Sequence, residues 1–315
     1  MKFRNVGRSG IKVGPLAFGG NVFGWTADET TSFHLLDAFV DSGLNLIDTA
    51  NVYSTWVPGH NGGESESIIG AWLRKTGKRD RIVIATKVGK PMGGERKGLS
   101  RKHIMQAVED SLRRLHTDYI DLYQSHEDDP AVPLEETLGA FADLLKSGKV
   151  RAIGASNFGA ARLQAALDVS SRLGCPRYET LQPEYNLYAR EAFEHELRPV
   201  CERANLGVLP YFSLASGFLT GKYRSEKDLS MSTRGSRVKG FLNERGYRIL
   251  DALDRVSREK NATPAQVALA WLMAQPTIVA PLASATSVSQ WNELQASIHL
   301  ELSEGDIALL NQASA

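Results

Sequence analysis

Four side chains of complementary chemistry stand in the first half of the sequence: Asp48, Tyr53, Lys87 and His126. A phenol is a weak acid because its ordinary pKa is about 10, but a neighbouring ammonium such as that of Lys87 stabilises the phenolate and lowers this pKa. The Asp48 carboxylate can keep Lys87 charged, and a neutral His126 can donate a hydrogen bond to a carbonyl oxygen. This division of roles suits carbonyl reduction, in which hydride arrives on carbon and Tyr53 delivers a proton to the developing alkoxide.

Each of these residues also has an ordinary structural interpretation. Asp48 could be a strand-end cap, Tyr53 a loop aromatic, Lys87 a solvated strand end and His126 a satisfied polar residue. A different chemistry is that of a lyase or aldolase in which Lys87 forms a Schiff base, a role that desolvated lysines take. Asp48 argues against that role because it keeps the amine protonated, and four complementary groups at three consecutive strand ends favour the reductase interpretation.

Short aliphatic and β-branched runs recur along the chain, each followed by a stretch with helical spacing. A closed (β/α)8 TIM barrel is therefore predicted, since short links between alternating strands and helices make the strands parallel. In such a barrel the polar residues that follow successive strands converge at one end. The predicted strands are residues 16–19, 44–47, 82–86, 119–123, 150–154, 178–181, 207–210 and 277–280.

Helix signals separate several of these strands. Helices are predicted over 28–42, 100–115, 134–147 and 265–274, with Gly43, Ser100, Pro133 and Thr263 at their ends. Residues 3–6 and 11–13 flank a Gly-rich turn and predict a β-hairpin that closes the barrel floor. An open doubly wound sheet is disfavoured, because the Gly-rich segment 19–24 is not followed directly by a helix.

Bulk composition fits one domain over residues 1–315, with 42% hydrophobic and 23% charged residues. A formal charge of +1 disfavours nucleic acid or an anionic membrane as partner. The chain has no signal-peptide pattern and no run of about 18 apolar residues, so a cytoplasmic protein is expected. Cys175 and Cys201 stand outside any metal or redox motif and are interpreted as reduced packing thiols. The oligomeric state is not predicted.

Several local phrases resemble the signatures of the aldo-keto reductase family in order and spacing, over nearly the whole chain. They are LIDTANVY (46–53), GESE (63–66), ATKVG (85–89), DYIDLYQSH (118–126) and IGASNF (153–158). The resemblance implies that Asp48, Tyr53, Lys87 and His126 form the catalytic tetrad, with the tyrosine as acid/base. It also implies a nicotinamide cofactor that lies extended across the barrel mouth without a Rossmann turn.

The same resemblance assigns residues to that cofactor. Ser156, Asn157 and Gln182 match residues that hydrogen-bond the nicotinamide carboxamide, and Tyr211 matches the aromatic on which the ring stacks. The segment after the seventh strand matches the pyrophosphate-binding stretch. Other implied contacts are Phe212, Leu214, Ser216, Gly217, Lys222, Ser284, Thr286, Gln290 and Glu293.

One departure concerns the choice of cofactor. The segment 281–290 offers no Lys or Arg for the 2′-phosphate of NADP, although Ser284, Thr286 and Gln290 could hydrogen-bond it and the 224–239 loop carries cations. NADP(H) is favoured on the resemblance, and NAD(H) or dual use stays open.

The substrate is expected to be a small carbonyl compound. Phe23, Trp25 and Trp56 lie on loops expected at the mouth and predict an apolar wall, with surface packing as the alternative. A metal site is not predicted, because the acidic residues around His60 and His126 are more simply solvated loops. Residues 89–98 and 223–240 are predicted loops, and the second is long enough to cover the mouth. A third hypothesis is a nicotinamide-binding, redox-sensing regulatory protein without fast turnover.

Overall fold

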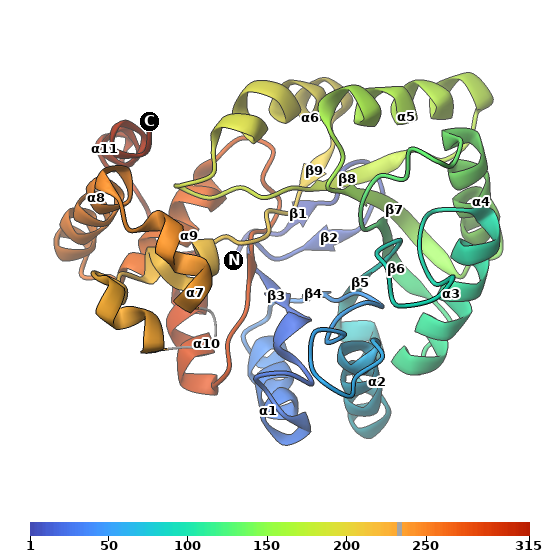
Figure 1. Cartoon of the computed structure of the whole chain (residues 1–315), viewed down its shortest axis with the longest axis horizontal. Coiled ribbons are helices and arrows are strands. Elements are labelled where there is room, and N and C mark those ends of the chain that lie inside the picture. The colour runs from blue at the N-terminus through green and yellow to red at the C-terminus, as the bar shows by residue number, and fades with distance from the viewer. Residues whose placement is uncertain (232–234) are drawn as a thin grey trace.

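The computed structural model describes residues 1–231 and 235–315. Its centre is a sheet of eight parallel strands, curled into a barrel with helices on its outer side (Figure 1). The (β/α)8 fold predicted from the sequence is thereby confirmed. In sheet order the strands are β10 (Leu282–Ala283), β3 (Ala17–Gly19), β4 (Leu46–Asp48), β5 (Val83–Val88), β6 (Ile120–Ser125), β7 (Val150–Ser156), β8 (Tyr178–Gln182) and β9 (Gly207–Val208).

The last strand differs from its prediction. Residues 277–280 are not a strand but a connection that runs alongside β9, and pairing with β3 begins only at Leu282. The Val208 amide donates to the Thr277 carbonyl at 3.0 Å and the Val279 amide donates to the Val208 carbonyl at 2.8 Å, which joins the two ends of the sheet. Pro281 has no N–H, so the ladder cannot continue through it. Pro210 likewise keeps β9 shorter than the predicted 207–210.

The predicted helices are confirmed to within a few residues as α1 (Glu29–Asp41), α3 (Arg101–Leu115), α4 (Leu134–Lys146) and α9 (Pro264–Ala274). Their N-terminal amides are satisfied as the sequence indicates: Asp28 accepts from Thr31, Ser100 accepts from His103, and Thr263 forms a capping box with Gln266. The other α-helices are α2 (Glu64–Thr76), α5 (Ala160–Leu173), α6 (Arg198–Ala204), α7 (Gly235–Val238), α8 (Glu244–Lys260), α10 (Val288–Gln295) and α11 (Glu304–Ser314).

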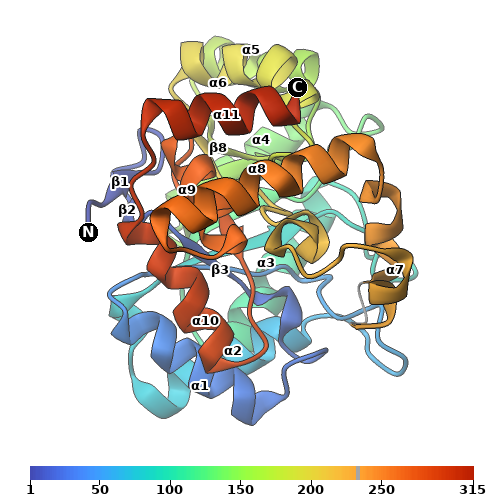
Figure 2. The same cartoon turned by 90° about the vertical axis from the view of Figure 1, so that its left-hand side faces the viewer.

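The segment after β9 is more structured than the predicted loop 223–240. Its described part forms short 3-10 turns at Glu226–Met231 and Lys239–Phe241, on either side of α7. Residues 232–234 of that predicted loop lie outside the described residues. Farther on, α8 and α11 lie side by side on the outer surface (Figure 2).

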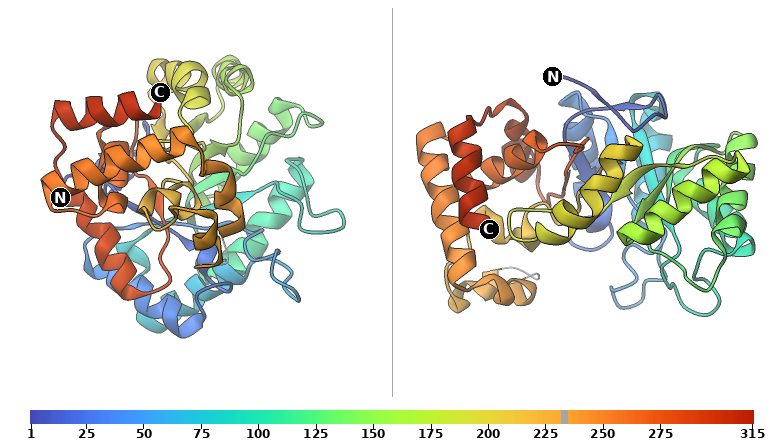
Figure 3. Two further views of the ribbon diagram at one scale, coloured as in Figure 1. Left: turned by 60° about the vertical axis from the view of Figure 1, so that its left-hand side comes forward. Right: turned by 90° about the horizontal axis from the view of Figure 1, so that it is seen from above.

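The N-terminal hairpin forms as predicted, with β1 (Arg4–Asn5) antiparallel to β2 (Lys12–Val13). The Arg4 guanidinium donates to the carbonyls of Ile278 at 2.9 Å and Met273 at 3.0 Å. Val6 and Val13 are buried with apolar side chains from the barrel strands, so the hairpin closes the end at which the strands begin. The loops after β4 and β5 lie at the opposite end (Figure 3).

Candidate active site

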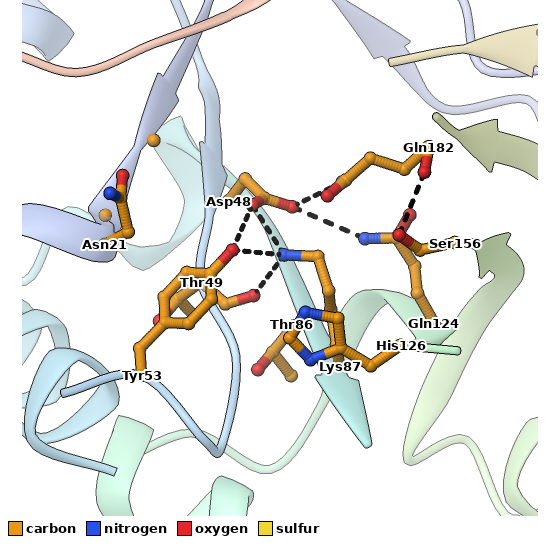
Figure 4. A network of polar contacts seen from close by, with 12 residues as sticks. Asn21, Asp48, Thr49, Tyr53, Thr86, Lys87, Gln124, His126, Ser156 and Gln182 are labelled. Carbon is orange, nitrogen blue, oxygen red and sulfur yellow. Dashed lines mark hydrogen bonds and ion pairs between the residues drawn. The ribbon is translucent and has the colours of Figure 1, made fainter. Parts of the chain in front are cut away.

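Lys87, near the end of β5, is fully buried at the mouth of the barrel. Its ammonium donates to Asp48 Oδ2 at 2.6 Å, to the Thr49 carbonyl at 2.8 Å and to the Tyr53 hydroxyl at 3.0 Å (Figure 4). Burial lowers the pKa of Lys87, and the adjacent Asp48 carboxylate opposes that effect. An ammonium has three N–H donors, and these contacts engage all of them.

Asp48 ends β4 and is buried with Lys87. Its two oxygens have different partners. Oδ2 faces the Lys87 ammonium and accepts from the Tyr53 hydroxyl at 3.4 Å, whereas Oδ1 accepts from the amides of Gln182 at 2.8 Å and Gln124 at 3.4 Å. Both oxygens of the carboxylate are therefore fixed by hydrogen bonds, and Oδ2 is the one that contacts Lys87 and Tyr53.

Tyr53 is placed by the turn that follows β4. The amides of Thr49 and Asn51 donate to the carbonyls of Ala85 and Lys87, so the chain stays beside β5. At Ser54 the backbone takes φ +76°, and the Ser54 hydroxyl donates to the Phe23 carbonyl at 2.9 Å, which turns the chain back. The phenol thus lies above Lys87 with its ring partly exposed at the mouth.

The pKa of Tyr53 is raised, whereas the sequence predicts that Lys87 lowers it. Burial and the Asp48 carboxylate raise it well above its ordinary value, although Lys87 is in contact with the hydroxyl. The Lys87 ammonium alone would lower this pKa, but desolvation and the negative charge of Asp48 outweigh it. The resting group is therefore the neutral phenol, which is the form that can give a proton.

His126 directly follows β6, and its amide donates to the Val88 carbonyl at 2.8 Å, which fixes it next to β5. Its ring packs edge-on to that of Tyr53, with 5.9 Å between the centroids. Burial and the nearby charge of Lys87 lower the pKa of His126 well below its ordinary value. Nδ1 is buried and meets no partner among the residues described. The lowered pKa favours the neutral imidazole at neutral pH.

The neutral state of His126 should be visible in how the stability of wild-type protein and of His126→Gln depends on pH. Because the pKa of His126 is lower in the folded protein than in the unfolded chain, the unfolded state takes up a proton first as the pH falls below about 6.5. Wild-type protein should therefore lose stability relative to His126→Gln as the pH is lowered from about 7.5 to 5. The melting temperatures of both proteins over this range measure the difference, and parallel curves would contradict a neutral, buried His126.

The residues assigned to the nicotinamide lie at the same barrel mouth. Ser156 is buried at the end of β7 and donates to the Gln182 carbonyl at 2.9 Å, while the Gln182 side chain is turned to Asp48. Asn157 takes a positive φ of 56°, and its amide donates to the His126 carbonyl at 2.8 Å. The Tyr211 hydroxyl donates to Asn157 Oδ1 at 2.7 Å. These four residues are brought together beside the tetrad.

The segment after Tyr211 has an unusual backbone. Phe212, Ala215, Ser216 and Gly217 have positive φ values of 50°, 47°, 57° and 98°. Successive residues with backbone reversals of this kind form concavities that bind anions. Leu214 and Ser216 are partly buried in this turn, and Phe212 is exposed. Asn186, which the sequence analysis did not single out, is buried and donates to the Phe212 carbonyl at 3.0 Å.

Lys222 supplies positive charge to this turn. Its ammonium lies 3.7 Å from the point that a Cβ on Gly217 would occupy, and 5.0 Å from the centre of the Tyr223 ring. The side chain is exposed and forms no ion pair within 1–231 and 235–315. The ammonium therefore lies beside the 212–217 turn without a carboxylate partner among the described residues.

The residues after β10 hydrogen-bond to one another and to residues elsewhere in the chain. The Ser284 hydroxyl oxygen lies 2.7 Å from both the Gly19 carbonyl oxygen and Asn21 Oδ1. The Thr286 amide and hydroxyl both donate to Gln290 Oε1, at 2.9 and 3.0 Å. The Glu293 carbonyl accepts from Gln266, and the Glu293 side chain is exposed.

The three aromatic residues predicted at the mouth differ in burial. Phe23 is fully buried and stacks on Phe18 with 5.2 Å between the centroids, so it belongs to the core and not to the mouth. Trp56 is 43% exposed, and its ring packs against those of Trp25 and Tyr53, with 5.7 and 6.0 Å between the ring centroids. Phe23 follows a 3-10 turn over Gly20–Val22 in which Gly20 and Val22 are buried. The sequence of this turn shows no periodic pattern from which the burial of Phe23 could be predicted.

Among the described residues, no group of three or more His, Cys, Asp or Glu side chains could hold a metal ion. None of the helices in this part of the chain is both long and apolar enough to cross a membrane.

Comparison with known proteins places this geometry in a family. Residues 15–315 match the model of the "Aldo/keto reductase family". The chain is 35% identical to the "Uncharacterized oxidoreductase YrpG" of Bacillus subtilis (99% of this chain, 95% of that protein) and 34% identical to the "Aldo-keto reductase YhdN" of the same organism (88% and 82%). It is also 34% identical to the "Probable voltage-gated potassium channel subunit beta" of Arabidopsis thaliana (93% and 90%). The chain therefore belongs to the aldo/keto reductase family.

Proposed function

We propose that the protein reduces aldehydes and ketones to alcohols reversibly with NADP(H), and that Tyr53, Lys87, Asp48 and His126 carry the reaction. Membership of the family already implies oxidoreduction with a nicotinamide cofactor. The observation that carries the finer proposal is the contact of the neutral Tyr53 phenol with a buried ammonium at the barrel mouth.

The residues present suit such a cofactor. Tyr211 offers a flat face, Asn157 and Gln182 offer amides, and the 212–217 turn with Lys222 offers an anion site. When bound, the nicotinamide supplies or accepts the hydride at the carbonyl carbon. Tyr53 gives its phenolic proton to the carbonyl oxygen, and Lys87 stabilises the phenolate that is left. Neutral His126 donates a hydrogen bond to the same oxygen and orients it.

The Schiff-base alternative is weaker in view of these contacts. A nucleophilic lysine needs a free lone pair, but Lys87 donates to three oxygens and one of them is a carboxylate. A regulatory role has support of another kind, since some relatives bear the name of a potassium channel subunit beta. It would be revealed by a cofactor that stays bound through dialysis without turnover.

The direct test is a panel of aldehydes and ketones assayed with NADPH and NADH separately. We expect turnover of several carbonyl compounds, faster at low cofactor concentration with NADPH. Turnover with neither cofactor across the panel would overturn the proposal, and faster turnover with NADH would overturn the choice of NADP(H).

Replacing Lys222 is expected to weaken cofactor binding. Loss of a charge-assisted contact to phosphate costs about 1.5–3 kcal/mol, so Lys222→Met should raise the Kd for NADPH by about tenfold or more. Quenching of tryptophan fluorescence on titration with each cofactor measures this. Lys146→Met, in the last turn of α4 and exposed, is the matched control. If Lys222→Met binds both cofactors with wild-type affinity, Lys222 does not contact the cofactor.

A further inference from the structure

Gln124 is a buried residue of the barrel wall that has no role in the reaction proposed above. It lies on β6, directly paired with Lys87 of β5 on one side and with Gly154 of β7 on the other. Its side chain is fully buried and points to Asp48 (Figure 4). We infer that Gln124 is a positioning residue for the reaction, because it holds Asp48 Oδ1 and so keeps Oδ2 turned to Lys87 and Tyr53. This inference rests on the proposed function.

The orientation of the Gln124 amide follows from its partner. A carboxylate only accepts hydrogen bonds, so the amide nitrogen must face Asp48, where Nε2 lies 3.4 Å from Oδ1. The amide oxygen is then left buried with no donor among the described residues. A buried oxygen without a donor costs about 1–3 kcal/mol of stability, so the fold alone does not account for this side chain.

A glycine makes room for this arrangement. A Cβ on Gly154 would lie 3.0 Å from Gln124 Cγ and 2.1 Å from the Thr180 hydroxyl oxygen, so any side chain there would displace its neighbours. Thr180, on the far side of Gly154, is as deeply buried as Gln124, but its hydroxyl has no partner in the described part of the chain. Thr180 therefore offers a matched control on the same row of the barrel.

A second glutamine donates to the same oxygen but has another task. Gln182 lies 2.8 Å from Asp48 Oδ1, and it is also one of the residues proposed to contact the nicotinamide. A cofactor that engages Gln182 competes for its amide, whereas Gln124 lies on β6 and has Asp48 as its hydrogen-bond partner. Gln124 thus keeps the carboxylate in place whether the cofactor is present or absent.

The first test replaces the amide by an apolar chain of similar length. Gln124→Met should lower kcat about tenfold while the Kd for NADPH stays within about twofold of wild type. The melting temperature should stay the same or rise, because the unsatisfied oxygen is removed. Thr180→Val should leave kcat unchanged. Unchanged kcat in Gln124→Met, or a loss of kcat matched by a loss of melting temperature, would overturn the positioning role.

The second test needs neither cofactor nor turnover. Gln124→Glu has the shape of glutamine, but the introduced carboxyl carries a charge beside Asp48 unless it is protonated. Burial next to a carboxylate raises the pKa of the new group in the folded state above the unfolded value of about 4.3, so the variant should gain stability relative to wild type as the pH falls. In an Asp48→Asn background this gain should shrink. An equal gain in both backgrounds would show that Gln124 does not act on Asp48.

The two tests separate two failures. If wild-type protein turns over no carbonyl compound, the proposed function fails, and the pH-dependent stability of Gln124→Glu still decides whether Gln124 acts on Asp48. If wild type is active and Gln124→Met is as active, the inference fails alone.

Discussion

Tyr53→Phe should lower kcat for carbonyl reduction by about 10²–10⁴-fold, since it removes only the hydroxyl that gives the proton. The neutral phenol is in contact with Lys87, and its ring is partly exposed where a substrate would bind. The ring itself remains, so packing against Trp56 and His126 is kept. Single-turnover kinetics with saturating NADPH measure the chemical step, and the Kd for NADPH should change little.

A second tyrosine provides the control for this substitution. Tyr123 is fully buried on β6, and its hydroxyl meets no partner within the described residues. Tyr123→Phe should therefore leave kcat at the wild-type value. If Tyr53→Phe binds the cofactor normally and reduces carbonyls at the parent rate, Tyr53 is not the proton donor.

Removing Lys87 is expected to have the largest effect on stability. Lys87 and Asp48 form an ion pair in which both side chains are almost fully buried. Lys87→Met leaves the carboxylate buried without its counter-charge, which costs about 3–5 kcal/mol in the free energy of unfolding. The same change should lower kcat by at least about 10²-fold, because the phenolate loses the charge that stabilises it. Urea unfolding and steady-state kinetics measure the two losses separately.

A double substitution separates charge from catalysis. Lys87→Met combined with Asp48→Asn removes both charges and should recover most of the lost stability, while activity stays low. Arg101→Met is the control for loss of an ion pair as such, because Arg101 and its partner Asp143 are each about half exposed, and it should cost less than about 1 kcal/mol. If the double variant is no more stable than Lys87→Met, the buried charge is not the source of the cost.

The sequence allowed much of the site to be predicted because strand ends meet in a barrel. Asp48 and Lys87 lie at the ends of β4 and β5, and His126 directly follows β6, so parallel pairing of these strands places all three at one end of the barrel. Only the strand boundaries were needed for that inference. The same reasoning placed Tyr53 at the mouth, although the turn that lifts it over Lys87 depends on backbone contacts that the sequence does not show.

Other features depend on three-dimensional neighbours that no pattern encodes. The raised pKa of Tyr53 results from burial as well as from the distance to Asp48, and these compete with Lys87. Nothing in the sequence of β6 (IDLYQS), in which Asp121 and Ser125 are polar as well, indicates which residue Gln124 contacts. Its meaning comes from Asp48, which lies 76 residues earlier.

The hairpin at the floor of the barrel bears on how the chain acquires its structure. The Arg4 guanidinium donates to the carbonyl of Ile278, which lies 274 residues later in the chain. This hydrogen bond can therefore form only after most of the chain has been synthesised. Until then Val6 and Val13 have no complete apolar surroundings, since Val279 and Leu282 belong to the same cluster. Contacts this distant in sequence slow folding and prolong the life of partly open chains. Closure of the barrel floor is therefore expected late in folding, after residues 278–282 have been synthesised.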